Sequence, residues 1–170
     1  MNSGDETSGE PLFANLCDDD PSLVAAVAKA RETLEHFKAA LCKASFNEAS
    51  FMVKVPFLDR SVAGEEALVQ TADVAAEYPS LPIAHLWLRL NSVLDNLLFC
   101  SVSEAPECLG LKEGDSFVVQ EEITEDWMIY QEGIVYGAFS LRAIRSSLAE
   151  KDRTRFDAYT GIHEFKGDTP

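Results

Sequence analysis

Three side chains that could bind a polar or aromatic group alternate along one short stretch, namely His85, Trp87 and Arg89. Successive side chains of a strand point to opposite faces, so in a strand over residues 83–90 these three project from one face of a sheet. An imidazole, an indole and a guanidinium in line could hold an acidic or planar group through hydrogen bonds and stacking. The alternative is that Trp87 packs under a helix while the other two pair with nearby carboxylates.

A second group of candidate residues lies nearer the C-terminus, at Asp126, Trp127 and Arg142. Asp126 could accept hydrogen bonds from backbone N–H groups in a turn, or it could pair with Arg142 or Arg89. A structural role is favoured for Asp126, and Trp127 could either line a pocket or fill the core. The six predicted binding residues are thus His85, Trp87, Arg89, Asp126, Trp127 and Arg142.

The spacing of reactive residue types does not favour catalysis. A hydrolase could combine Ser140 with His85 and Asp126, but the sequence has no GxSxG motif and Ser140 is well placed to cap a helix. The histidines at 36, 85 and 163 lie far apart and form no HxxxH or HExxH pattern. The sequence therefore predicts no catalytic residue, no metal site and no cofactor, and an enzyme is the less favoured class.

A long amphipathic helix should precede these residues. Asp20 and Pro21 form a typical helix start, since an acidic cap precedes a proline in the first turn. Apolar residues then recur at alternating spacings of four and three up to residue 44, which places them on one helical face: Leu23, Val27, Ala30, Leu34, Phe37, Leu41 and Ala44. This face could dock on a sheet of the same chain, and a homodimer through the 22–44 helix is the alternative.

The rest of the chain reads mainly as strands. Alternating patterns and Gly or Pro punctuation predict strands over residues 51–57, 83–90, 96–102, 115–121, 127–130 and 134–139, with a short helix over 65–76. Gly133 supplies the turn of a hairpin, and a helix capped by Ser140 closes the fold. We expect an acidic tail over 1–20 and one α+β domain over 21–165. That domain would hold a mostly antiparallel sheet of about five strands, an N-terminal amphipathic helix and a C-terminal helix.

The formal net charge of -15 argues against nucleic acid or an anionic membrane as a partner. It permits a basic protein partner. No segment has the length and apolar character of a membrane span, and residues 1–10 lack the pattern of a secretory signal, so we expect a cytoplasmic protein.

Several short motifs, in order, resemble the YegJ-like bacterial domain family of unknown function. They are Phe51 to Phe57, His85 to Leu88, Gly114-Asp115, Asp126 to Ile129, and Gly137 to Arg142. The resemblance covers about residues 46–148. It implies a fold and no catalytic residues, because none are established for that family.

Two classes of function follow. The favoured class is a non-enzymatic protein-interaction module that uses an acidic surface or the His85 face, for example an immunity or antitoxin-like protein that neutralises a basic toxin. The alternative is a small-molecule-binding or hydrolytic domain that uses the same face with Asp126 and Arg142. A concave pocket with convergent polar groups would favour the alternative.

Overall fold

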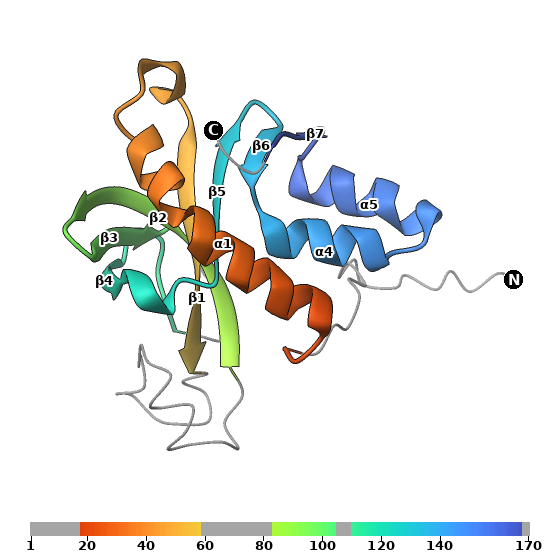
Figure 1. Ribbon diagram of the computed structural model, residues 1–170. Helices are drawn as coiled ribbons and strands as arrows, with labels where there is room; N and C mark the ends of the chain where they lie inside the picture. The colour runs from red at the N-terminus through yellow and green to blue at the C-terminus, as the bar shows by residue number, and fades with distance from the viewer. Residues whose placement is uncertain (1–17, 59–82, 105–109, 168–170) are drawn as a thin grey trace, which may run out of the picture.

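The computed structural model describes residues 18–58, 83–104 and 110–167, which form one mixed sheet with helices packed on it (Figure 1). The strands are β1 (Ser50–Leu58), β2 (Ile83–Leu94), β3 (Leu97–Val102), β4 (Ser116–Gln120), β5 (Asp126–Gln131), β6 (Ile134–Gly137) and β7 (Glu164–Phe165). The helices are α1 (Pro21–Ala40), α4 (Phe139–Ser147) and α5 (Glu150–Thr160), with short 3-10 turns η1 (Ala44–Phe46) and η3 (Glu121–Ile123).

The sheet has the strand order β4-β3-β2-β1-β5-β6-β7, and every pair is antiparallel except β6 with β7. The expected α+β class and the mostly antiparallel sheet are confirmed. The expected number of about five strands is wrong, since the sheet has seven. The two-residue strand β7 is too short to show any alternation in sequence.

Helix α1 begins as expected, because the Asp20 side chain accepts a hydrogen bond of 2.8 Å from the Ser22 N–H and Pro21 occupies the first turn. It ends at Ala40, earlier than predicted. Its apolar face is buried in the same chain at Ala30, Leu34 and Phe37. The homodimer through residues 22–44 stays a prediction.

The C-terminal part contains two helices where one was expected. A tight turn of Glu132 (φ 50°) and Gly133 (φ 82°) joins β5 to β6, with the paired positive φ values typical of a type I′ hairpin. Helix α4 then begins at Phe139. The prediction that Ser140 is the N-cap is wrong, because the N-cap position is Ala138, a left-handed residue whose side chain cannot cap.

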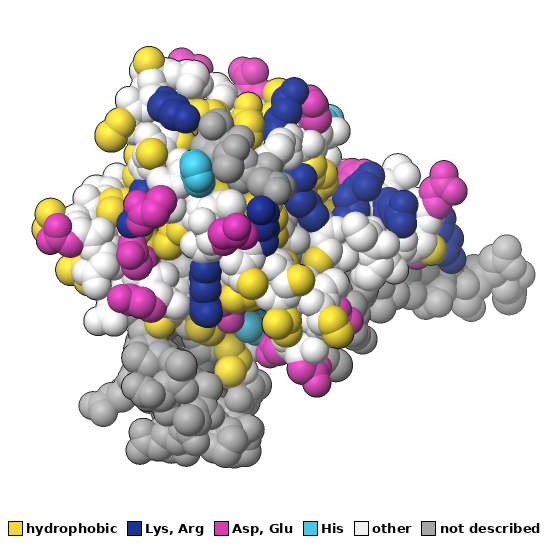
Figure 2. Space-filling model, in the orientation of Figure 1, with side chains coloured by type: hydrophobic (Ala, Val, Ile, Leu, Met, Phe, Trp, Pro, Cys, Tyr) yellow, Lys and Arg dark blue, Asp and Glu magenta, His cyan; other side chains and the backbone are white. Residues whose placement is uncertain are grey.

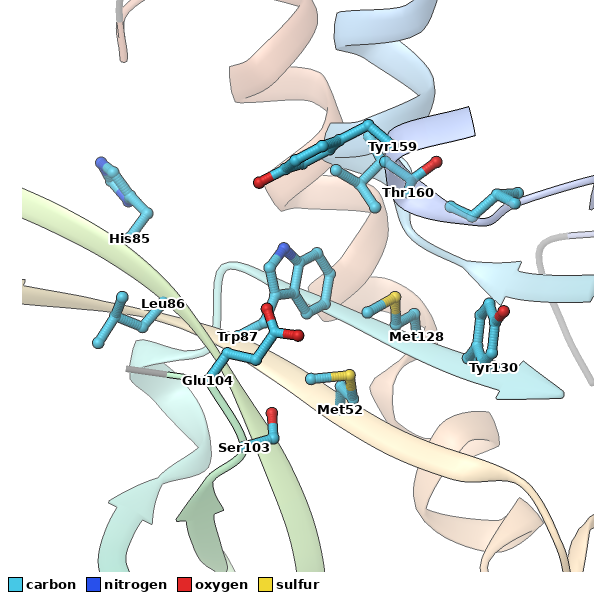
Figure 3. Close-up of a pocket in the computed structure, with 12 residues that line it drawn as sticks. Met52, His85, Leu86, Trp87, Ser103, Glu104, Met128, Tyr130, Tyr159 and Thr160 are labelled. Carbon is cyan, nitrogen blue, oxygen red and sulfur yellow. The ribbon is translucent and has the colours of Figure 1, made fainter. Parts of the chain in front are cut away.

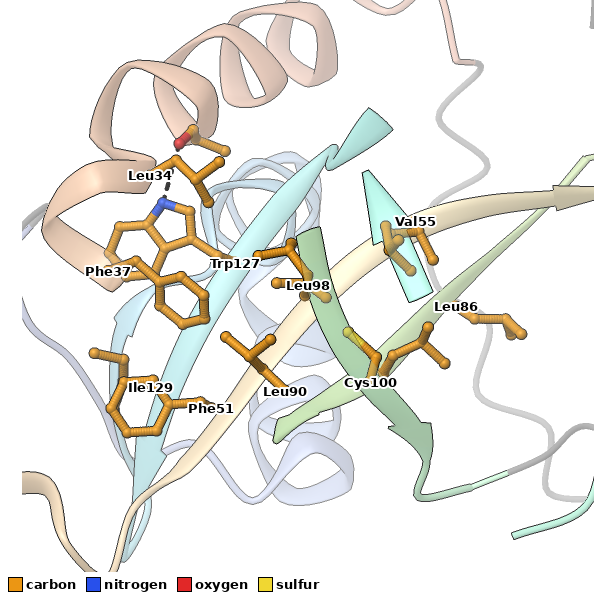
Figure 4. Packing of buried hydrophobic residues seen from close by; sticks show 14 of the residues in the cluster. Leu34, Phe37, Phe51, Val55, Leu86, Leu90, Leu98, Cys100, Trp127 and Ile129 are labelled. Atoms are coloured by element: carbon orange, nitrogen blue, oxygen red, sulfur yellow. Dashed lines mark hydrogen bonds between the residues drawn. The ribbon is translucent and has the colours of Figure 1, made fainter. Parts of the chain in front are cut away.

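The main core lies between α1 and one face of the sheet. Trp127 is fully buried there, stacked on Phe37 with ring centroids 5.0 Å apart (Figure 4). Its ring nitrogen donates to the Ala30 carbonyl at 3.0 Å and to the Thr33 hydroxyl at 3.1 Å, so the polar atom of the indole is satisfied. Inward side chains of β1, β2 and β3 complete this layer.

Some expectations fall outside the described ranges. The predicted helix over 65–76 and residues 1–17 of the predicted tail lie there. In the part of the chain that the structure describes, no helix has both the length and the apolar character needed to cross a membrane.

Candidate functional site: a groove on the outer sheet face

The face of the sheet turned away from α1 carries an open groove of about 840 Å³ (Figure 3). Most of its lining side chains are apolar or aromatic. They are Met52, His85, Leu86, Trp87, Ser103, Glu104, Met128, Tyr130, Leu141, Tyr159, Thr160 and Ile162. A solvent-facing side of an antiparallel sheet ordinarily carries polar side chains, so this composition sets the groove apart.

The strand register places the floor of the groove. Met52 on β1 lies opposite Arg89 on β2 and Met128 on β5, while Lys54 lies opposite Trp87. Three neighbouring strands therefore bring the two thioethers and the indole together, as Figure 3 shows for Met52, Trp87 and Met128. All three side chains are only half-buried.

The end of α5 forms one wall. Tyr159 and Thr160 lie across the groove from Trp87, and the Tyr159 side of the wall is open, with that residue 66% exposed (Figure 3). The Tyr130 hydroxyl on β5 donates to the Gly161 carbonyl at 3.3 Å. This bond holds the end of α5 against the sheet and fixes the wall.

His85 lies at one end of the groove, where it is paired with the carboxylate of Glu125. Its Nδ1 is 2.6 Å from the Glu125 carboxylate, and this hydrogen bond raises the pKa of His85 above its ordinary value, although burial and the charge of Lys54 oppose the increase. The other ring nitrogen, Nε2, is 3.1 Å from Asp18 Oδ1. That distance suits an ion pair, and the charge of Asp18 also raises the pKa of His85, although Nε2 is buried and makes no hydrogen bond with a described residue.

Two cations adjoin the groove floor in the strand register, Lys54 opposite Trp87 and Arg89 opposite Met52. The charge of Lys54 acts on His85, and Arg89 approaches the Ser50 hydroxyl at 3.4 Å. Glu104 is different, because it lines the groove, is exposed, and has no ion pair or hydrogen bond with any described residue.

Asp126 serves the fold and has no exposed surface. Its two oxygens accept from the backbone N–H groups of Trp127 (2.8 Å), Phe139 (3.1 Å) and Ser140 (2.7 Å), and from the Ser140 hydroxyl (2.6 Å). The carboxylate thus caps α4 from a neighbouring strand. Burial raises the pKa of Asp126, and these hydrogen bonds oppose the increase.

Arg142 ties down the C-terminal end of the chain. Its Nε donates to the Gly137 carbonyl at 2.7 Å, another guanidinium nitrogen donates to the Lys166 carbonyl, and the guanidinium lies 5.0 Å from the centre of the Phe165 ring. Asp126 accepts hydrogen bonds at the start of α4 and Arg142 donates to these two carbonyls, so the two residues of the alternative small-molecule or hydrolytic site serve different contacts. Within the described ranges, His, Cys, Asp and Glu side chains form no group of three that could hold a metal ion.

The structure therefore divides the six predicted residues. His85 and Trp87 line the groove and Arg89 adjoins it, whereas Asp126 and Trp127 are buried and Arg142 binds backbone. Sequence reasoning missed the other ten lining residues, among them Met52, Glu104, Met128, Tyr130 and Tyr159. For the residues on β1 and β5, a signal was available, because Met52, Met128 and Tyr130 occupy the outward positions of their strands.

The fold and groove define a small α+β protein with one sheet face covered by a helix and the other partly open. By sequence, the chain belongs to the DUF2314 family, described as an uncharacterized protein conserved in bacteria, which it matches over residues 20–165. This confirms a bacterial family without an assigned function, and the YegJ-like naming stays a prediction. The matched range includes α1, which the sequence resemblance left out.

One curated relative matches part of the chain. It is a protein of Neisseria meningitidis serogroup B whose name describes an ankyrin repeat protein, and the two are 31% identical over 113 residues. The aligned region covers 65% of this chain and 38% of the relative, so the chain spans well under half of that protein. No solved structure matches the chain.

Proposed function

We propose that this protein is a non-enzymatic interaction module that receives a segment of a partner protein in the groove around Trp87. The observation that carries the proposal is the half-buried cluster of Met52, Trp87 and Met128 on the outer sheet face. Thioethers and aromatic rings adapt to irregular apolar surfaces, and they are enriched where proteins bind other proteins.

A hydrolytic role has less support from the contacts. The Ser140 hydroxyl donates to Asp126 at 2.6 Å and lies in a buried helix cap, while His85 is bonded to Glu125. A nucleophile, its base and an orienting acid need to share one hydrogen-bonded chain. Here they belong to two separate clusters.

Small-molecule binding is the second candidate. The volume of the groove lies within the range of about 300–1,000 Å³ that ligand sites occupy. However, its polar groups do not converge on one enclosed point, because Tyr130 bonds Gly161 and His85 bonds Glu125. The open shape and the apolar floor fit a protein segment better.

The expected acidic surface is not seen on the side of the molecule that Figure 2 draws. Ten of the 29 acidic residues, but one of the 14 basic residues, fall outside the described ranges. On the side of the molecule drawn in Figure 2, acidic and basic side chains are interspersed, and basic side chains gather over α4 and α5. We therefore propose the groove, and not an acidic face, as the binding surface. An antitoxin-like role remains a proposal supported by charge alone.

The test is site-specific photo-crosslinking in a bacterium that carries this gene. A benzophenone amino acid is placed at position 159 beside the groove, and at position 24 on α1 as a control, since Val24 is also exposed (55%). We expect a defined protein adduct from position 159, lost when Trp87→Ala is added. Equal adducts from both positions would contradict the proposal. A metabolite that copurifies with wild type and not with Trp87→Ala, seen by native mass spectrometry, would favour the small-molecule function.

A further inference from the structure

We infer that the partner segment anchors in the groove through a basic side chain, an arginine or a lysine, held by Trp87, Tyr159 and the carboxylate of Glu104. This inference rests on the proposed function and names the chemistry of the partner. It starts from Glu104, which is the carboxylate that lines the groove without an ion pair or hydrogen bond to any described residue.

Two other carboxylates close to the groove already have partners within the chain. Glu125 is bonded to His85, and Asp126 accepts four hydrogen bonds around the start of α4. Lys54 lies opposite Trp87 in the strand register and its charge opposes the raised pKa of His85, while Arg89 lies opposite Met52 and donates to the Ser50 hydroxyl at 3.4 Å. Neither cation forms an ion pair with Glu104 in the part of the chain that the structure describes. Glu104 thus offers a negative group beside the groove floor, and a cation from outside the chain would complement it.

Aromatic rings supply the second part of the site. Figure 3 shows the Glu104 carboxylate in front of the Trp87 indole, with the Tyr159 ring on the opposite wall. A guanidinium or ammonium is attracted to the face of such a ring within about 6 Å, and the attraction grows as water is excluded. The methylene stem of the basic side chain can pack on the thioethers of Met52 and Met128 while its charge stays near Glu104.

The charge of the whole chain supports the same partner. A net charge of -15 attracts basic segments over a distance and raises their rate of encounter. An acidic segment would be repelled both by the net negative charge of the chain and by Glu104. A basic anchor is therefore the occupant that fits the groove and the chain together.

The experiment is an NMR titration of the full-length, nitrogen-labelled protein with short peptides that share a Leu-X-Leu centre and differ only at X, which is arginine, norleucine or glutamate. The two tryptophan ring N–H signals report separately, because Trp87 lines the groove and Trp127 is buried. We expect the Trp87 signal to shift and the Trp127 signal to stay. The arginine peptide should bind about five- to twentyfold more tightly than the norleucine peptide, and the preference should weaken as salt is raised.

Two matched variants each remove one negative charge. Glu104→Gln removes it from the groove, and the control Glu32→Gln removes it from the exposed side of α1. Glu104→Gln should remove most of the arginine preference, and Glu32→Gln should leave it. If wild type binds the arginine and norleucine peptides equally, or prefers glutamate, the inference is overturned and the proposed function survives. If no peptide shifts Trp87, or if that signal moves with protein concentration alone because a second copy fills the groove, both fall.

Discussion

The two tryptophans of this protein show how differently the two faces of one sheet are used. Trp127 on β5 lies on the α1 side, fully buried, with its ring nitrogen bonded to Ala30 and Thr33. Trp87 on β2 lies on the other side, half-buried, on the floor of a groove. The same residue type thus completes a core on one face and offers a contact surface on the other. The difference arises because α1 covers the face that carries Trp127.

The largest expected effect comes from removing the indole on the covered face. Trp127→Ala should lower the free energy of unfolding by about 3–5 kcal/mol, because it leaves a cavity beside Phe37 and removes two hydrogen bonds. Trp87→Ala should cost about 1 kcal/mol or less, since its ring remains partly in water. Urea denaturation of both variants measures the contrast. Equal losses of stability would show that the outer face is packed as a second core, which would contradict the contrast between the two tryptophans.

The next effect concerns the helix cap beside Trp127. Asp126→Ala should lower the free energy of unfolding by about 2–4 kcal/mol, because the buried N–H groups of Phe139 and Ser140 lose their acceptor. Asp115→Ala is a comparison on an exposed loop, where the carboxylate accepts one bond of 2.8 Å from the Lys112 N–H. A cost no greater than that of Asp115→Ala would show that α4 needs no carboxylate cap.

A smaller effect tests how tightly the covered face is packed. Gly137 has φ +70°, and an added Cβ would lie 2.5 Å from the Trp127 ring. Gly137→Ala should therefore cost about 2 kcal/mol or more, from backbone strain and from displacement of the ring. Gly110→Ala separates the two causes, because Gly110 has φ +62° and no atom of the described residues lies within 4 Å of an added Cβ. Similar losses of stability at both positions would mean that the packing around Trp127 yields easily.

The smallest effect lies at the end of the groove. The raised pKa of His85 means that folding favours its protonated form, so its pair with Glu125 contributes fully below pH 6.5 and loses its contribution as the pH rises through the raised pKa. The stability difference between wild type and His85→Gln should be about 1 kcal/mol or less and should shrink above pH 6.5. Urea denaturation across pH measures it, with His36→Gln on the exposed side of α1 as the control. A difference that grows with pH would reverse the proposed sign.

Local patterns in the sequence were sufficient for most elements. Period-two alternation located β1 and β2 and placed His85, Trp87 and Arg89 on one face, and the spacing of apolar residues identified α1. These features depend on neighbours along the chain. The sequence could not show which face of the sheet α1 would cover. Because α1 covers the face that carries Trp127, Trp127 is part of the core and Trp87 on the other face stays accessible.

The missed features depend on contacts between distant segments. Asp126 caps a helix that begins 13 residues later. Ala138 has a left-handed backbone conformation, which alanine rarely adopts, so nothing in the sequence indicated it. Tyr159 and Glu104 come to the groove from α5 and from the end of β3, so no spacing relates them to Trp87. The net charge led to the prediction of a basic partner, but composition alone cannot place a binding surface on the fold.

The cap on α4 has a consequence for the order in which the chain opens. Asp126 and its acceptor bonds to Phe139 and Ser140 span only 13 or 14 residues, and the β5–β6 hairpin closes that span. The hairpin must form before the helix start is satisfied, so the strand, turn and helix over residues 126–147 should act as one cooperative unit. Amide hydrogen exchange under native conditions should then release the protected amides of this unit together, at a free energy distinct from that of the groove wall on α5.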